Sequence, residues 1–203
     1  MPVQNLERAI SKANAGQLIT NYLELVEQVG NPVANFKGLR LIQALKREAV
    51  EAGPYPKVTL FEAANRIMSD LVILYGVRWL LDNNVFPFGT YTVQYGIDDK
   101  NAFDIQATSD GKKLIGEAFN VAPSFFQTKK TSVLKKLRQR DVSADYKIIM
   151  FNHDAVERSY KPKPKNNEFF VFVQVLTDDS YMVPNERLHP TAQKGGGGWA
   201  GGR

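Results

Sequence analysis

The sequence predicts a mixed α/β protein of the α+β kind, with N-terminal helices followed by a central mixed β-sheet that helices flank. Three observations predict this class. The 203 residues are 43% hydrophobic, which is enough for one sizeable core. Apolar residues recur at helical spacing through the first part of the chain, and β-rich segments interrupted by one further helix follow it.

The first part of the chain is predicted to be helical. Residues 6–29 and 36–50 place apolar side chains at helical spacing, for instance Ile19, Tyr22 and Val26. The stretch "GPYP" ends the second segment, and "TLFE", which begins at Thr59, has the form of a capping box before a third helix that runs to Asp82. We therefore expect an N-terminal helical region over residues 1–56.

The second part is predicted to form the sheet. Three adjacent strands are expected over residues 91–97, 103–109 and 113–121. A helix that begins with the capping pattern "SFFQ" at Ser124 and ends near Gln139 follows them, and two more strands are expected over residues 146–153 and 168–176. These elements make up an expected α/β core over residues 57–190. Residues 191–203 form a glycine-rich tail, read either as a disordered terminus or as an arm that contacts nucleic acid.

A hairpin turn at Asp110-Gly111 predicts the register of two strands. This dipeptide favours a type I′ turn, because both central positions need positive φ. With Ser109 opposite Lys112, counting outward places Asp104 directly opposite Glu117. The alternative is a longer or bulged turn, in which the two acids diverge.

Two facing carboxylates need a physical reason. Side chains on opposed strand positions have Cβ atoms about 4.5–5.5 Å apart, so two ionised carboxylates there repel each other. Mg²⁺ is commonly bound by one or two carboxylates while it keeps water and phosphate oxygens as further ligands. Asp104 and Glu117 are therefore candidate Mg²⁺ ligands.

The composition narrows the class of partner. Cysteine is absent and there are two histidines, which argues against thiolate and multi-histidine metal sites. Residues 123–165 hold eleven Lys or Arg against four Asp or Glu, and such a basic region attracts polyanions such as nucleic acid. Without a leader pattern or a long apolar run, we expect a cytoplasmic protein with no membrane partner.

Lys130 is the candidate basic residue of the site. It lies four residues after Phe126, within the apolar stripe of its helix, where a lysine is costly unless its ammonium group reaches a partner or extends to solvent. The acid pair is one such partner, and extension to solvent is the alternative.

The arrangement over residues 59–176 resembles the PD-(D/E)XK nuclease superfamily, which includes many type II restriction endonucleases. In that superfamily a helix precedes three strands, the second and third strands carry the acids, and a helix and further strands follow. The resemblance implies a restriction-endonuclease-like fold and a Mg²⁺-dependent endonuclease that hydrolyses duplex DNA at a specific site, with Asp104 and Glu117 as catalytic metal ligands. Phe119 stands where the family places its lysine, and no proline precedes Asp104. Some members supply the base from the following helix, which makes Lys130, or Lys129, the candidate.

Further residues have roles in this interpretation. Gln106 shares the face of Asp104 and could orient a water or a phosphate, and Asn120 is a weaker replacement for the missing lysine. Glu62 could add an acid or cap its own helix. The expected contacts to the DNA backbone are Lys135, Lys136, Arg138, Lys161 and Lys163.

Cleavage of both strands favours a homodimer, with the N-terminal helices as the dimerisation or DNA-embracing element. Two alternatives to a nuclease remain open at this point. One is a non-catalytic, nuclease-like DNA-binding protein or subunit. The other is a protein-interaction domain whose basic surface meets an acidic partner.

Overall fold

The computed structural model describes residues 3–30, 33, 35–96, 102–141, 143–165, 167–177 and 179–185. The predicted glycine-rich tail and His189 lie outside the described residues. The helices are η1 (Val3–Asn5), α1 (Ala15–Glu27), α2 (Gly38–Arg47), α3 (Leu60–Asp82), α4 (Pro123–Arg140) and η2 (His153–Ala155). The strands are β1 (Ala9–Ser11), β2 (Thr90–Val93), β3 (Ile105–Ser109), β4 (Lys112–Phe119), β5 (Tyr146–Asn152), β6 (Glu168–Gln174) and β7 (Asp179–Val183).

The predicted fold class is confirmed. Seven strands form one mixed sheet in sequence order, β1 to β7. β4, β5 and β6 run parallel to one another, and the outer pairs are antiparallel. Parallel strands need a crossover, and α4 provides it between β4 and β5.

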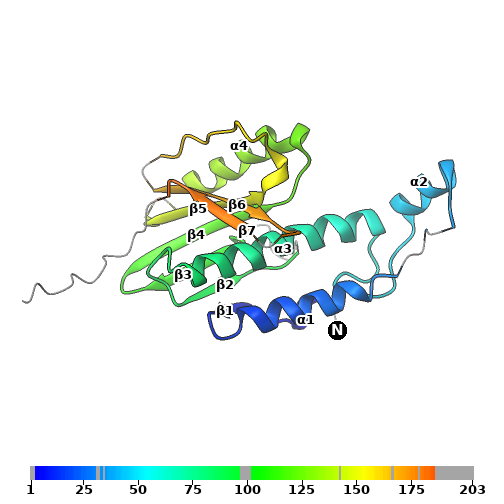
Figure 1. Ribbon diagram of the computed structural model, residues 1–203, viewed down its shortest axis with the longest axis horizontal. Helices are drawn as coiled ribbons and strands as arrows, with labels where there is room; N and C mark the ends of the chain where they lie inside the picture. The colour runs from blue at the N-terminus through cyan, green and yellow to red at the C-terminus, as the bar shows by residue number, and fades with distance from the viewer. Residues whose placement is uncertain are drawn as a thin grey trace, which may run out of the picture.

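Helices cover both faces of the sheet, α3 on one side and α4 on the other (Figure 1). Successive residues of the central strands alternate between the two cores. Leu114 and Ile148 belong to the core under α3, whereas Ile115 and Ile149 belong to the core under α4. α3 lies close to the sheet because Gly76 has no side chain, and a Cβ there would meet the sulfur of Met150. The acid-bearing strands β3 and β4 are thus held between two helices.

The hairpin register is confirmed residue by residue. Ser109 lies opposite Lys112 and Ile105 lies opposite Gly116, as the turn chemistry predicts. Asp110 and Gly111 both have positive φ, at 50° and 74°. Continuing this register by one pair places Asp104 opposite Glu117, at the point where β3 begins.

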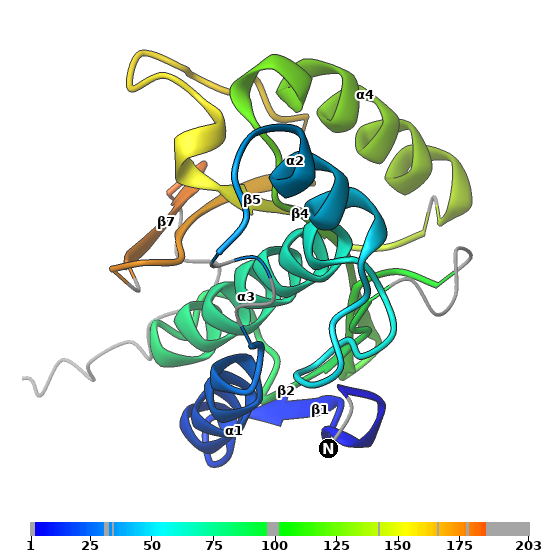
Figure 2. The same ribbon diagram turned by 90° about the vertical axis from the view of Figure 1, so that its right-hand side faces the viewer.

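The N-terminal region differs from the prediction. Residues 9–11 form β1, an edge strand paired with β2, where a helix was expected over residues 6–29. A strand of three residues is too short to show the alternating pattern of a β-strand in the sequence. The helical pattern that α1 gives to the following residues also hides it. α1 packs with α3 in the same core, since Leu18, Ile19 and Tyr22 are buried with residues of α3. α2 projects beyond the sheet near the start of α3 (Figure 1), and Figure 2, in which that end of the molecule faces the viewer, shows α2 in front.

Two other element predictions need correction. α4 begins at Pro123 after Ala122, with no side-chain cap, so the expected cap at Ser124 is wrong. Proline is favoured in the first helical turn because its missing N–H has no helical partner there. β7 was not predicted.

The predicted Thr59 cap at the start of α3 is confirmed, because the Thr59 hydroxyl accepts a hydrogen bond from the Glu62 N–H at 3.2 Å.

Candidate functional site

The two predicted acids meet in one cleft between α3 and α4. The cleft has a volume of about 520 Å³, and both Asp104 and Glu117 line it. Asp104 precedes β3 and its Oδ2 accepts a hydrogen bond from the Ala118 N–H at 2.8 Å. Glu117 lies in the middle of β4 and its side chain is almost fully buried. The strand pairing therefore fixes two carboxylates side by side in a partly closed space.

The protonation of this pair is shifted by its surroundings. Burial raises the pKa of Glu117, and the neighbouring Asp104 carboxylate raises it further. Burial likewise raises the pKa of Asp104, although its hydrogen bond from Ala118 and the cations of α4 act in the opposite direction. Burial is the largest cause for both carboxyl groups, and the cations of α4 offset it only in part. A divalent cation would add positive charge beside the two acids.

Lys136 is the lysine that reaches the acids. Its Nζ lies 2.5 Å from Glu117 Oε1 and donates a hydrogen bond to the Ala102 carbonyl at 2.8 Å. Lys129 also lines the cleft. Lys129, Ser132 and Lys136 follow one another at spacings of three and four residues, so one face of α4 presents them together. The wall contributed by α4 is therefore cationic.

Lys130, the predicted catalytic lysine, is placed elsewhere. Its Nζ lies 3.3 Å from the Tyr160 hydroxyl and over the rings of Phe126 and Tyr160. As expected, Lys130 is partly buried along α4, but its ammonium group contacts the rings of Phe126 and Tyr160 and not the acid pair. Lys130 does not line the cleft. Lys136 replaces it as the candidate lysine of the site, and its expected role as a simple backbone contact is revised.

α3 forms the opposite wall. Glu62 and Arg66 lie at the cleft with their side chains 2.5 Å apart as an ion pair, and Ser69 and Asp70 follow on the same helix face. Glu62 thus contributes an acid to the lining of the cleft, where Arg66 pairs with it, and the capping bond comes from the Thr59 hydroxyl and not from the Glu62 carboxylate. The guanidinium of Arg66 also lies over the Tyr55 ring, at 5.3 Å from the centroid.

Asp70 was not predicted from the sequence. It is 1% exposed, and its Oδ2 accepts hydrogen bonds from the Tyr22 hydroxyl at 2.7 Å and from the Tyr55 hydroxyl. Its Oδ1 accepts from the Gly96 N–H at 3.1 Å. Burial raises the pKa of Asp70 to about 6, and the three hydrogen bonds lower it in part. This network joins α1, α3 and the end of β2 behind the cleft.

The remaining predicted residues do not line the cleft. Gln106 is half-buried in β3, between Thr92 and Ile115 on the neighbouring strands. Asn120 donates its backbone N–H to Ser69 Oγ at 3.4 Å.

Among the predicted backbone contacts, three lysines are exposed and one arginine is engaged in the fold. Lys135, Lys161 and Lys163 lie on the surface. Arg138 donates two hydrogen bonds, of 2.5 and 2.9 Å, to the buried carboxylate of Glu168. Burial raises the pKa of Glu168, but the bonds and charge of Arg138 together with the bond from the Lys165 N–H and its charge outweigh burial and leave the pKa lowered. Arg138 is thus a structural ion-pair partner, and its expected DNA contact is not supported by its position.

The donor set of the cleft fits a hard divalent cation. No described residues form a group of three or more His, Cys, Asp and Glu side chains able to hold a metal, so protein ligands would be limited to the two carboxylates. Mg²⁺ accepts such a set, because it retains several waters and binds substrate phosphate oxygens. Glu117 Oε1 is buried, and within the described ranges no donor completes an aligned hydrogen bond to it although Lys136 Nζ is close. The residues present therefore fit the cation.

Comparison with known proteins adds no family assignment. No protein-family model matches the chain, and neither curated proteins nor solved structures match it. In the part of the chain that the structure describes, no helix has the length and apolar character needed to cross a bilayer.

Proposed function

We propose that this protein is a Mg²⁺-dependent DNA endonuclease that hydrolyses phosphodiester bonds in the cleft between α3 and α4. The order of elements, α3, three antiparallel strands, α4 and then the parallel strands β5 and β6, agrees with the arrangement of the PD-(D/E)XK superfamily. By that resemblance, Asp104 before β3 and Glu117 in β4 correspond to the acids of the superfamily. Restriction-type cleavage at a specific site is the form of the activity that we propose.

One observation carries the proposal. Two carboxylates with raised pKa values lie opposed in a cleft, beside a lysine that contacts one of them. For folding alone this cluster is unfavourable, because burial and mutual repulsion both oppose ionisation. Carboxylates whose pKa values are shifted in this way are commonly found at functional sites. A cation bound between the acids and a phosphate would offset the repulsion between the two carboxylates.

The residues have distinct roles in the proposed hydrolysis. Mg²⁺, when bound, activates a water and stabilises negative charge on the phosphoryl oxygens. Asp104 and Glu117 hold the cation. Lys136, fixed by the Ala102 carbonyl, is placed to orient the attacking water or to stabilise the phosphate. The water oxygen bonds to phosphorus and loses one proton to solvent, one P–O ester bond breaks, and the leaving oxygen takes up one proton from solvent.

The cations around the cleft suit a polyanionic substrate. Lys129 lies in the cleft, Lys135 is exposed on the same helix, and Lys161 and Lys163 are exposed on the loop between β5 and β6. These side chains would contact phosphates without reading sequence. We further propose a homodimer for double-strand cleavage, with cytoplasmic DNA as the substrate.

The ion pair between Lys136 and Glu117 also favours one alternative. A lysine that neutralises Glu117 could take the place of the metal permanently, and Phe119 at the position of the family lysine agrees with lost chemistry. The protein would then be a non-catalytic, nuclease-like DNA-binding protein. DNA binding without metal-dependent cleavage is the signature of that alternative.

The test is incubation of a mixture of long duplex DNAs with the protein, in Mg²⁺ or in EDTA. We expect the wild type to produce discrete fragments in Mg²⁺ and none in EDTA. The single variants Asp104→Asn and Glu117→Gln should produce no fragments in Mg²⁺. Asp110→Asn is the matched control, because this acid lies in the exposed hairpin turn. Intact DNA that is still retarded on a gel would support the binding protein, and DNA that is neither cut nor bound would overturn both functions.

A further inference from the structure

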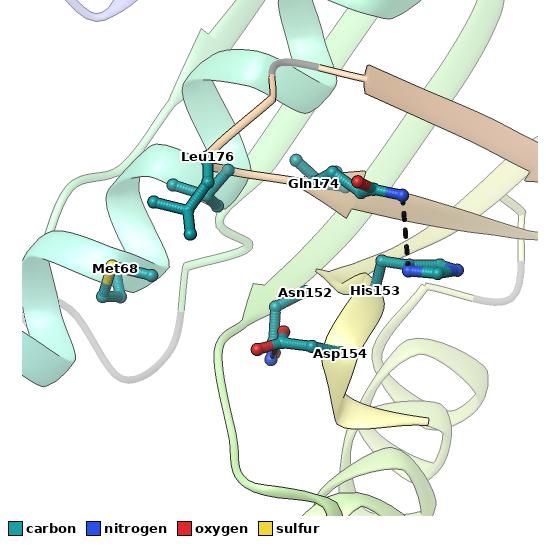
Figure 3. Close-up of a pocket in the computed structure, with 8 residues that line it drawn as sticks. Met68, Asn152, His153, Asp154, Gln174 and Leu176 are labelled. Atoms are coloured by element: carbon teal, nitrogen blue, oxygen red, sulfur yellow. Dashed lines mark hydrogen bonds between the residues drawn. The ribbon is translucent and has the colours of Figure 1, made fainter. Parts of the chain in front are cut away.

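A second pocket lies at the carboxyl ends of the parallel strands β5 and β6 (Figure 3). It has a volume of about 190 Å³, which suits one planar ring system and is too small for a folded peptide segment. One side is aliphatic, formed by Met68 of α3 together with Val173, Val175 and Leu176. Leu176 is 95% exposed, so its side chain is free to cover a ligand. In open α/β sheets, ligands bind at this edge of the strands.

The polar side of this pocket offers mostly acceptors. Asn152 is fully engaged: its side-chain oxygen accepts from the Val121 N–H at 2.9 Å, and its Nδ2 donates to the Val121 carbonyl and to Asp154 Oδ1. The bond from Asn152 Nδ2 positions the Asp154 carboxylate and uses one lone pair of its Oδ1, which leaves a second lone pair on that oxygen. Gln174 Oε1 accepts from Thr177, and Gln174 Nε2 lies 3.5 Å from His153 Nδ1. The second carboxylate oxygen of Asp154 and the second lone pair of Gln174 Oε1 remain able to accept.

A ligand for this pocket therefore needs a flat apolar body and an edge rich in N–H donors. A nucleobase with an exocyclic amino group has both properties, and carboxylates accept from such amino groups. Guanine fits best, since two adjacent donors on its Watson–Crick edge can face one carboxylate. Thymine, which has one N–H donor between two carbonyls, fits poorly.

The pocket and the cleft share a wall. Met68 and Ser69 are consecutive in α3, and they face the pocket and the cleft respectively. The end of β4 lies between them, because the Asn120 N–H bonds to Ser69 and Val121 is held by Asn152. Val121 is four residues beyond Glu117, or about 13 Å at ~3.3 Å per strand residue. That span corresponds to about four base-pair steps of a duplex.

From this geometry we infer that the pocket at the ends of β5 and β6 binds a single nucleobase bearing an amino group, most favourably guanine, turned out of the DNA near the cleaved bond. The inference rests on the proposed nuclease function for the identity of the polymer. Enzymes that extrude a base read its Watson–Crick edge by hydrogen bonds and hold its faces between aromatic or apolar side chains. Met68 and Leu176 would hold the faces, and Asp154 would read the edge.

The test uses free nucleosides, which lack phosphate and so do not report on the basic surface or the cleft. Backbone amide shifts of the ¹⁵N-labelled protein are followed by NMR during titration with deoxyguanosine, deoxyinosine, deoxycytidine and thymidine. We expect deoxyguanosine to shift the amides of residues 152–154 and 174–176 in the millimolar range. Deoxyinosine, which lacks the 2-amino group, should bind more weakly, and thymidine should leave these amides unmoved.

Variants separate the pocket from the rest of the molecule. Asp154→Asn keeps an oxygen for Asn152 and replaces the free acceptor with a donor, so deoxyguanosine affinity should fall by about tenfold or more. Asp110→Asn is the matched surface control. Leu176→Ser should also weaken binding, whereas Leu39→Ser, at an equally exposed leucine of α2, should not.

Each outcome bears on the inference separately from the nuclease function. Glu117→Gln should retain deoxyguanosine binding while it loses cleavage. Amides that no nucleoside moves would overturn the base pocket, even if DNA is cut normally. Equal affinities for deoxyguanosine and thymidine, or an Asp154→Asn variant that binds like the wild type, would also overturn it. Deoxyguanosine binding in a protein that does not bind DNA would support the pocket and remove the nuclease function.

Discussion

Lys136 and Lys130 show how a residue's role depends on which flank of a helix it occupies. Both lie on α4, but the ammonium group of Lys136 contacts Glu117, whereas that of Lys130 lies against Tyr160. A cation that contacts charge developing in the transition state contributes far more than one elsewhere.

We predict that Lys136→Ala lowers the DNA cleavage rate by about 100-fold, the order seen when one transition-state contact is removed. Lys130→Met should leave the rate within about threefold, since it keeps the apolar packing. Lys135→Ala, one residue before Lys136 and exposed, is the matched control. Single-turnover cleavage at saturating protein is the measurement. A larger loss in Lys130→Met than in Lys136→Ala would reverse the assignment.

The buried Asp70 leads to a second prediction at the residue scale, which concerns how the unfolding free energy of the protein changes with pH. Burial raises its pKa to about 6 from a normal value of 3.8, so the folded protein holds this proton more tightly than the unfolded chain. The resulting stabilisation is complete below about pH 4 and is lost as the pH rises through 6. A shift of this size corresponds to about 3 kcal/mol of unfolding free energy.

The variant that tests this is Asp70→Asn, which cannot ionise. We expect the wild type to lose stability relative to this variant between pH 4 and pH 7, by up to about 3 kcal/mol, in urea unfolding at a series of pH values. Asp104 and Glu117 titrate in both proteins and largely cancel in the difference. A flat Asp70→Asn difference across this range would mean that Asp70 stays ionised in the folded state.

At the scale of elements, the β3–β4 hairpin shows what local sequence can predict. Its register follows from two turn residues, because Asp110 and Gly111 supply the positive φ values that the tight turn needs. The position of Lys136 could not be predicted in the same way. Helical spacing separates the two flanks of α4, but the sheet decides which flank borders the acids. The spacing of Lys129, Ser132 and Lys136 is a signal that could have found it.

The turn itself is testable by a matched pair of glycine substitutions. Gly111→Ala should destabilise the protein by about 1 kcal/mol, since a Cβ finds open space there but φ is +74°. Gly89→Ala also meets open space and has no positive φ, so it should be nearly neutral. Urea unfolding of both variants is the measurement. Equal urea midpoints for the two variants would show that alanine takes up the positive φ at position 111 without loss of stability.

At the scale of the whole molecule, the site depends on contacts that sequence patterns do not encode. The acids were predictable because one hairpin holds both. Asp70, Arg66 and Ser69 join them only because α3 crosses the sheet beside the same strands. β1 was missed for a related reason, as a three-residue strand is specified by its partner β2 more than by its own sequence.

The basic region of residues 123–165 shows the same limit of sequence analysis. Some of the Lys and Arg residues counted there are used inside the fold and are not exposed to a partner. Of the cations in residues 123–165, Lys147 is buried, Arg138 is bonded to Glu168 and Lys136 forms an ion pair with Glu117. The exposed cations of this region include Lys129, Lys135, Arg158, Lys161, Lys163 and Lys165. The electrostatic contact with DNA should therefore come from such exposed cations, and we expect Lys129, Lys135, Lys161 and Lys163 to contribute to it.

The salt dependence of DNA binding measures that contact. Each phosphate contact contributes about −0.9 to the slope of log affinity against log salt concentration. Replacing Lys135 and Lys163 together by glutamine should make the slope shallower by about two, measured by anisotropy in EDTA so that cleavage does not interfere. Lys12→Gln with Lys112→Gln, at exposed lysines outside this region, removes the same charge and should change the slope little. Equal slopes for the two double variants would mean that net charge, and not this surface, attracts DNA.

Arg138→Ala completes the argument, because the sequence predicted a DNA contact for this cation whereas the structure pairs it with Glu168. It should leave the salt slope unchanged and instead lower the unfolding free energy by about 2 kcal/mol. This is below the ~3–5 kcal/mol of a fully buried broken pair, since the Arg138 side chain is 38% exposed. A shallower slope with unchanged stability would place Arg138 among the DNA contacts after all, and would require Glu168 to find another partner.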